Sequence, residues 1–179
     1  RGQHPRREVA QLMTPADAAD AAPDPQLVPD RIPLEEVYMR LAEELARRST
    51  CRRRSVGAVI TSADLTRVLG VGYNGGAKGI NNECLGPGGP GDPCTTCIHA
   101  ETNAVAKAGS AESGKWAFIT HSPCVLCATL LINSNVAHVL YRREYRDLGG
   151  VSLLHRAGVD ARSYDQLAGA FRGPLPQDP

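Results

Sequence analysis

The sequence has few aromatic residues and almost no net charge. Aromatic side chains make up 4% of the 179 residues, so we expect a mainly aliphatic core. Lysine and arginine number 20, against 19 aspartate and glutamate residues. A dedicated DNA- or RNA-binding protein usually carries a strong excess of basic residues. The balance of charge therefore favours a small-molecule substrate over a nucleic acid.

The sequence also lacks a long hydrophobic run. No stretch approaches the roughly 20 apolar residues that a membrane-spanning helix needs, and the first residues contain no apolar segment typical of a signal peptide. We therefore expect a cytoplasmic protein without membrane contact. In a reducing compartment, cysteines at short spacing bind metal or serve catalysis more often than they form disulfides. The 6 cysteines are Cys51, Cys84, Cys94, Cys97, Cys124 and Cys127.

Composition divides the chain into three segments. Residues 1–30 are rich in Ala, Asp, Pro and Arg and show no apolar periodicity, which predicts a disordered arm. Residues 31–171 contain the periodic segments, and we expect them to form one domain. Residues 172–179 are expected to be a flexible tail that contains proline.

Hydrophobic periodicity predicts alternating helices and strands between residues 31 and 171. Leu34, Val37, Tyr38, Leu41 and Leu45, for example, recur at helical spacing. The predicted helices span 33–48, 99–108, 124–133 and 148–157, and the predicted strands span 55–61, 67–73, 116–120, 136–141 and 159–163. This order predicts a three-layer α/β/α fold with a mixed five-stranded sheet, in which the first pair is antiparallel and the later strands are parallel. A ligand site is then expected at the carboxyl ends of the parallel strands.

Two short motifs carry candidate metal ligands. One is His99-Ala100-Glu101, and the other runs from Pro123 to Cys127 with cysteines at 124 and 127. The two cysteines lie three residues apart at the start of a predicted helix and so share a face. Ser122 is predicted to cap this helix, with Pro123 as its first residue. The amino end of a helix favours the thiolate form that metal binding requires.

Two thiolates and one imidazole leave one position of a tetrahedral zinc ion open, which is the arrangement of catalytic zinc sites. Glu101 would then be a carboxylate beside the ion that moves protons. The alternative is a structural zinc site that pairs Cys94-x-x-Cys97 with Cys124-x-x-Cys127. An H-x-E motif followed by P-C-x-x-C is, however, the signature of zinc deaminases, and it favours the catalytic interpretation.

With these motifs the chain resembles the cytidine deaminase superfamily, and within it the deoxycytidylate deaminases. The resemblance runs from about Val37 to Val159. It includes Ser49 to Ile60 as an opening strand and Gly72 to Gly75 as a substrate loop, besides both zinc motifs. It implies a cytidine-deaminase-like fold and the zinc-dependent hydrolysis of dCMP to dUMP with release of ammonia.

The resemblance also implies a role for each site residue. Glu101 takes a proton from water, protonates N3 of cytosine and helps ammonia to leave. Asn74 hydrogen-bonds the sugar, and the backbone of Ala58 helps to frame the base. Taken alone, the Asn-Gly pair at 74 and 75 would more simply be a turn. The implied zinc ligands are His99, Cys124 and Cys127.

A dense basic cluster lies before the first predicted strand. Such a run is usually a solvated face. Alternatively, one or two of its guanidinium groups bind the 5′-phosphate of the substrate. Arg52 and Arg53 are the preferred candidates because they adjoin the strand. The cluster consists of Arg47, Arg48, Arg52, Arg53 and Arg54.

Four cysteines remain once the catalytic ligands are assigned. Four is the number that a closed structural zinc site needs, and some relatives in the family carry a second zinc ion. The alternative is four buried or free thiols, since free cysteine is often a small core residue. The four residues are Cys51, Cys84, Cys94 and Cys97.

Two further functions are compatible with the same zinc residues. A tRNA or DNA deaminase would share every ligand, although the near-neutral charge argues against it. A non-catalytic, zinc-stabilised binding module would leave Glu101 without a role. The resemblance also allows activation by dCTP, inhibition by dTTP and assembly into a homo-oligomer, either a dimer or a hexamer.

Overall fold

The computed structural model describes residues 31–51, 53–79 and 96–166. The chain divides into two units, Arg1–Ile32 and Pro33–Pro179. The arm predicted over residues 1–30, the tail over 172–179, and the candidate site residues Arg52, Cys84 and Cys94 lie outside the described residues.

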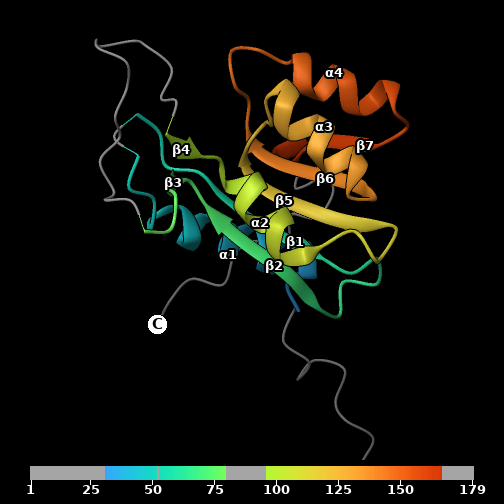
Figure 1. Ribbon diagram of the computed structural model, residues 1–179. Helices are drawn as coiled ribbons and strands as arrows, with labels where there is room; N and C mark the ends of the chain where they lie inside the picture. The colour runs from blue at the N-terminus through green and yellow to red at the C-terminus, as the bar shows by residue number, and fades with distance from the viewer. Residues whose placement is uncertain (1–30, 52, 80–95, 167–179) are drawn as a thin grey trace, which may run out of the picture. The chain divides into compact units, whose positions relative to one another are not determined.

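A mixed sheet of five strands forms the centre of the second unit (Figure 1). Its order is β2-β1-β5-β6-β7, where β1 is Gly57–Thr61, β2 is Val68–Tyr73, β5 is Lys115–His121, β6 is Val136–Arg143 and β7 is Asp160–Ser163. β1 pairs antiparallel with both β2 and β5, whereas β5, β6 and β7 are parallel. The predicted mixed sheet is therefore confirmed, including the antiparallel first pair.

A small second sheet pairs β3 (Gly75–Gly76) with β4 (Cys97–Ile98). Hydrophobic patterning did not predict it, because a strand of two residues has no measurable period. Its consequence is local: β4 ends immediately before His99, so this pairing ties the first zinc motif to the loop that follows β2.

Helices cover both faces of the five-stranded sheet (Figure 1). α1 (Leu34–Ala46) packs on the face that carries Val59, Phe118 and Leu140. The opposite face, with Ile60 and Ile119, is covered by α2 (Ala100–Ala108), α3 (Val125–Asn133) and α4 (Gly149–Arg156). The α/β/α prediction is confirmed. None of the helices in the described part of the chain has both the length and the hydrophobicity that a membrane crossing requires.

α1 buries a different face from the one its leucines indicate. Tyr38, Met39, Ala42 and Ala46 are buried, whereas Leu34, Val37 and Leu41 are 46%, 39% and 37% exposed. Gly57 on β1 has no Cβ atom, and a Cβ atom placed there would lie 1.9 Å from the carbonyl oxygen of Ala42. The backbone of α1 at Ala42 and Ala46 therefore packs directly against this glycine. Helical spacing thus located the helix correctly but not the face that it buries.

Candidate active site

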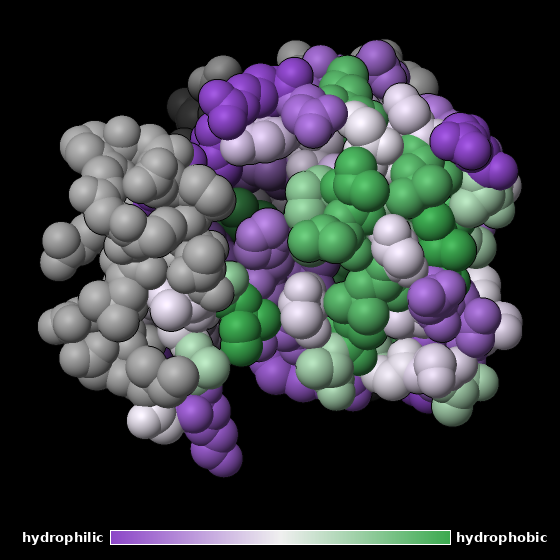
Figure 2. All heavy atoms as spheres, turned by 45° about the horizontal axis from the view of Figure 1, so that its top comes forward, coloured by the Kyte–Doolittle hydropathy of each residue, from purple (hydrophilic) through white to green (hydrophobic). Residues whose placement is uncertain are grey.

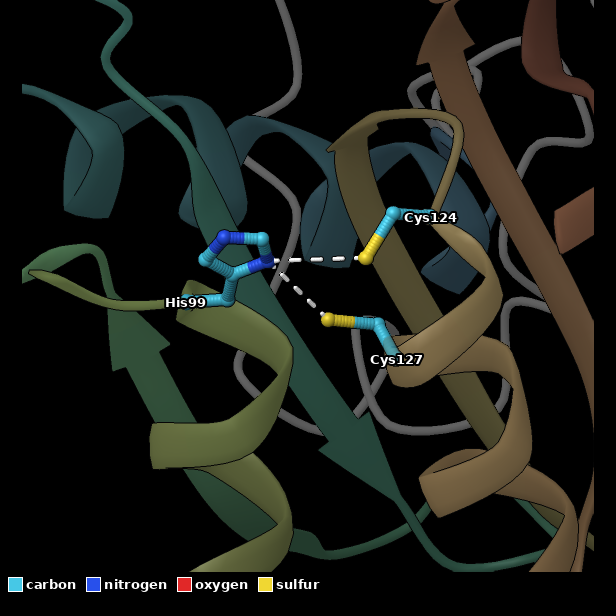
Figure 3. Close-up of side chains that lie close together, drawn as sticks. All are labelled: His99, Cys124 and Cys127. Carbon is cyan, nitrogen blue, oxygen red and sulfur yellow. Dashed lines mark hydrogen bonds between the residues drawn. The ribbon is translucent and has the colours of Figure 1, made fainter. Parts of the chain in front are cut away.

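Three metal-binding side chains converge where α2 and α3 begin (Figure 3). His99 immediately precedes α2, Cys124 immediately precedes α3, and Cys127 lies in the first turn of α3. The His99 Nδ1 atom is 3.2 Å from the Sγ atom of Cys127 and 3.7 Å from that of Cys124. All three ligand atoms lie within 4.8 Å of one another.

This geometry fits a zinc ion. Zinc binds imidazole nitrogen at about 2.0–2.1 Å and thiolate sulfur at about 2.3 Å, and tetrahedral angles then put nitrogen and sulfur about 3.5 Å apart. The two separations of 3.2 and 3.7 Å lie on either side of that value. Soft thiolate ligands also favour zinc over magnesium or calcium. Three protein ligands leave one position for water or substrate.

The ends of the two helices explain why the ligands meet. The backbone of both His99 and Cys124 is extended, with ψ of 155° and 169°, so each side chain leaves the helix axis at its amino end. Hydrogen bonds from Cys127 and His99 lower the pKa of Cys124 to about 3. The same bond to Cys124 raises the pKa of His99. The site therefore favours the thiolate form of Cys124, whereas the hydrogen bond with Cys124 and burial raise the pKa of Cys127. Without a cation, the pair of sulfur atoms thus carries one negative charge.

The predicted cap of α3 is wrong by two residues. α3 begins at Val125 with Cys124 in the cap position, and neither Ser122 nor Pro123 belongs to the helix. The Ser122 hydroxyl instead accepts the backbone N–H of Tyr145, at 2.7 Å. Serine followed by proline predicted the earlier start. The extended backbone of Cys124 instead directs its thiol to the metal site (Figure 3).

α4 contacts the P-C-x-x-C motif, Pro123 to Cys127, directly. A Cβ atom placed on Gly150 would lie 2.0 Å from the carbonyl oxygen of Pro123 and 2.8 Å from that of Cys124. Any other residue would have to push this backbone away. Gly150 therefore lets the start of α4 support the segment that carries Cys124.

Glu101 lies in the first turn of α2 and is only 5% exposed. Burial raises the pKa of its carboxyl group, while the nearby His99 opposes this shift. A carboxyl group whose pKa lies closer to neutrality is suited to accepting and returning a proton. Glu101 thus combines burial with a position next to the candidate metal site.

A cavity of about 430 Å³ opens beside these residues. Such a volume suits a small molecule, since ligand pockets typically span about 300–1,000 Å³. Its walls combine the zinc motifs with residues from the segments before β1, after β2 and after β6. The lining residues are Cys51, Arg53, Arg54, Val56, Asn74, Cys97, His99, Ala100, Glu101, His121, Ser122, Cys124, Tyr145 and Arg146.

One wall of the cavity is basic and aromatic. The guanidinium group of Arg54 lies 4.6 Å from the centre of the Tyr145 ring, and that of Arg146 lies 5.8 Å from it. Arg53 also lines the cavity. Sequence reasoning grouped Arg54 with the basic cluster but did not select it, and it missed Arg146. Only the fold brings the loop after β6 next to the segment before β1.

Asn74 is buried and lines the cavity, but its side chain also binds the chain itself. Its Oδ1 atom accepts the Val56 N–H at 2.8 Å, and its Nδ2 atom donates to the Arg54 carbonyl at 2.7 Å. Asn74 thereby holds the segment that carries Arg54. Ala58 does not line the cavity; it lies within β1, opposite Gly72 and Ile119, and Val56 takes its expected place on the wall.

Two of the remaining cysteines reach the same cavity. Cys51 and Cys97 both line it, and Cys51 is near enough to His99 to contribute to raising the pKa of that imidazole. Cys84 and Cys94 lie outside the described residues. Within the described ranges, the cluster of three or more metal-binding side chains is His99, Cys124 and Cys127.

Comparisons with known proteins agree with this geometry. Residues 33–143 match the model of the cytidine and deoxycytidylate deaminase zinc-binding region. The chain is 33% identical over 141 residues to the deoxycytidylate deaminase of Saccharomyces cerevisiae, a match that covers 73% of this chain and 44% of the yeast protein. It is 36% identical over 121 residues to ComE operon protein 2 of Bacillus subtilis, covering 65% of this chain and 63% of that protein.

A solved structure extends the likeness to the fold. The dCMP deaminase of cyanophage S-TIM5, in complex with dCMP and dUMP, superimposes with a TM-score of 0.64 and 36% sequence identity, covering 73% of this chain and 96% of the phage protein. The chain thus spans less than half of its yeast relative but nearly the whole of this viral enzyme.

Proposed function

The chain belongs to the cytidine and deoxycytidylate deaminase zinc-binding family, and from this premise we propose that it hydrolyses dCMP to dUMP and ammonia. The observation that carries the proposal is the cavity. Its lining combines the zinc motifs and a buried carboxyl group with a group of arginines. A nucleotide has a base to be deaminated at one end and a phosphate to be held at the other.

The three converging residues His99, Cys124 and Cys127 would hold the zinc ion. When bound, zinc supplies a Lewis acid that makes a water molecule acidic enough to attack at neutral pH. Glu101 accepts a proton from that water and delivers it to N3 of the cytosine. The hydroxide that remains adds to C4, and Glu101 then takes the proton of the new C4 hydroxyl group and passes it to the amino group. The C4–N bond breaks, so that the water oxygen stays on C4 as the carbonyl oxygen and nitrogen leaves as ammonia.

The basic wall would hold the phosphate. Arg54 and Arg146 approach the same tyrosine ring, and Arg53 lines the cavity beside them. A guanidinium group can bind two phosphate oxygens at once, and stacking on an aromatic ring fixes its plane. Arg53 stays a candidate from the sequence, Arg52 lies outside the described residues, and Arg54 and Arg146 join the set.

Asn74 would contact the sugar with its remaining hydrogen-bonding capacity. Its amide oxygen can accept one bond besides that from Val56, and its amide nitrogen can donate one besides that to Arg54. The Ala58 backbone stays a proposed contact of the base. It lies two residues after Val56, which lines the cavity.

A second zinc ion stays a proposal, with Cys51, Cys84, Cys94 and Cys97 as its ligands. The position of Cys51 and Cys97 on the same cavity supports a common site. Metal analysis should then give two zinc ions per chain, and Cys124→Ala should remove only one. A single ion in the wild type would reject the second site.

A cytoplasmic homo-oligomer that responds to dCTP and dTTP is the remaining part of the proposal, and it rests on the family resemblance. One surface supports self-association. Hydrophobic side chains gather on the face where α3 and α4 come forward (Figure 2), and Leu126 and Val125 on α3 are 81% and 46% exposed. Sedimentation of the wild type and of Leu126→Glu tests this, since a charge should weaken an apolar contact.

The proposed function is tested by a panel of substrates. Release of ammonia is measured with the zinc-loaded chain and dCMP, CMP, deoxycytidine, adenosine nucleotides or tRNA, with and without dCTP and dTTP. We expect dCMP to be deaminated best. Activity on tRNA alone would indicate a nucleic-acid deaminase, and no activity on any substrate would indicate a zinc-stabilised binding module.

A further inference from the structure

His121 is a polar residue of the cavity that the proposed chemistry does not use. It is the last residue of β5, at the carboxyl edge of the parallel strands, and it pairs in register with Arg143 on β6. The side chain is half-buried and lines the cavity. It follows Thr120 and lies three residues before Cys124, so it belongs to neither zinc motif.

Hydrogen bonding fixes which nitrogen of the His121 ring carries the proton. The Thr120 hydroxyl is buried and accepts the backbone N–H of Gly57 at 3.2 Å. Its own hydrogen needs an acceptor, and within the described part of the chain His121 Nδ1 provides one at 3.2 Å. With Nδ1 accepting, the proton of the neutral ring resides on Nε2.

The surroundings favour the uncharged form of this ring. Burial lowers the pKa of His121, and the positive charges of Arg54 and Arg143 lower it further. Protonation would put a third positive charge beside these two arginines. The ring therefore presents one N–H donor, on Nε2, and no net charge.

The same neighbours indicate what the donor would contact. Arg54 both influences His121 electrostatically and stacks on Tyr145 in the basic wall. His121 thus lies near Arg54, one of the arginines that line the cavity. Building on the proposed function, we infer that His121 is a specificity-determining residue whose Nε2–H donates to the phosphate-bearing end of the nucleotide.

His121 differs from the nearby arginines in the kind of contact that it would make with the substrate. An arginine attracts any anion, whereas an N–H donor on a ring held by Thr120 is fixed in direction. A hydrogen bond to a charged acceptor typically changes affinity by about 10- to 100-fold. We therefore expect His121 to set the preference for nucleotide over nucleoside and to act through KM.

The test uses His121→Leu, which keeps the volume without a donor, and His121→Gln, which keeps a neutral N–H donor of similar reach. The ratio of kcat/KM for dCMP to that for deoxycytidine is measured for each zinc-loaded variant. We expect the ratio to fall about 10- to 100-fold in His121→Leu through KM, and His121→Gln to restore most of it. Equal losses on both substrates, or a glutamine variant no better than leucine, would overturn the inference.

Two further measurements keep the test decisive. Calorimetric titration with dUMP and deoxyuridine reports the same preference without turnover. His121→Asn, in which the donor is retained but shortened, should behave like His121→Leu and replaces it if leucine impairs folding. Wild-type protein that deaminates no dCMP would refute the proposed function, whereas wild-type preference for dCMP that persists in His121→Leu would refute only the role of His121.

Discussion

Two groups of functional residues line the cavity, and they are built in different ways. The zinc side consists of four residues from two short motifs, each at the amino end of a helix. The arginine side consists of Arg54 and Arg146, which come from segments 92 positions apart in the printed sequence and meet at the ring of Tyr145. The first side depends on local helix geometry, and the second depends on the order of strands in the sheet.

Because of this difference, we expect the zinc side to serve catalysis and the arginine side to serve substrate recognition. Catalytic chemistry needs atoms held within a few tenths of an ångström, and helix starts supply such positions. Recognition of the phosphate tolerates longer side chains on loops, which are free to differ between proteins of one fold. Damage to the zinc side should therefore reduce turnover, while damage to the arginine side should change which substrate is used.

The largest effect is expected from Glu101→Gln, which removes the proton carrier while keeping the size of the side chain. The value of kcat should fall by about 10²–10⁴-fold, because that is what a positioned acid or base contributes, with zinc content unchanged. Glu112→Gln is the matched control, since this glutamate pairs with Arg67 at an exposed position outside the cavity. Near wild-type kcat in Glu101→Gln would contradict the proposed role.

The rate at which Cys124 is alkylated tests whether its thiol is ionised on the zinc side. With a pKa of about 3, Cys124 should be a thiolate throughout the neutral range once zinc has been chelated. An ordinary thiol with a pKa of about 8.5 is less than about 1% ionised at pH 6. Alkylation of Cys124, located by mass spectrometry, should therefore vary little between pH 6 and pH 8, and zinc should block it. A tenfold rise in rate per pH unit would show an ordinary thiol.

Arg54→Ala tests the arginine side. Loss of a charge-assisted contact should raise KM for dCMP about 10- to 100-fold and lower the preference for dCMP over deoxycytidine accordingly. Arg146→Ala should act in the same direction. Arg47→Ala is the matched control from the same basic cluster, since Arg47 pairs with Glu44 on the surface and does not line the cavity. An equal response in all three variants would mean that surface charge alone matters.

Gly150→Ala should have the smallest effect and should appear on the zinc side. The added methyl group would displace the backbone of Pro123 and Cys124, at a cost of about 1–3 kcal/mol in stability. Zinc should then be lost to a chelator at a lower concentration than in the wild type. Gly158→Ala is the control: its φ of 79° makes alanine unfavourable, but nothing lies within 4 Å of the new atom. Equal zinc retention in both variants would show that Gly150 does not support the segment that carries Cys124.

The comparison also explains what the sequence could predict. Spacing and turn residues predicted, in order, the helices α1 to α4 and the five strands of the main sheet among the described residues. The H-x-E and P-C-x-x-C motifs identified residues that do converge. The basic wall could not be predicted in the same way, because Arg146 becomes a neighbour of Arg54 only through the fold. The exposure of Leu34 and Leu41 has a similar cause, since the face of α1 that is buried is the one whose backbone packs against Gly57 of β1.

The central claim is that the zinc side performs deamination while the arginine side selects a nucleotide. The most direct measurement is the ratio of kcat/KM for dCMP to that for deoxycytidine in the zinc-loaded wild type. The account predicts a strong preference for dCMP that arises mainly from a lower KM. Equal use of both substrates, or a preference for deoxycytidine, would contradict it.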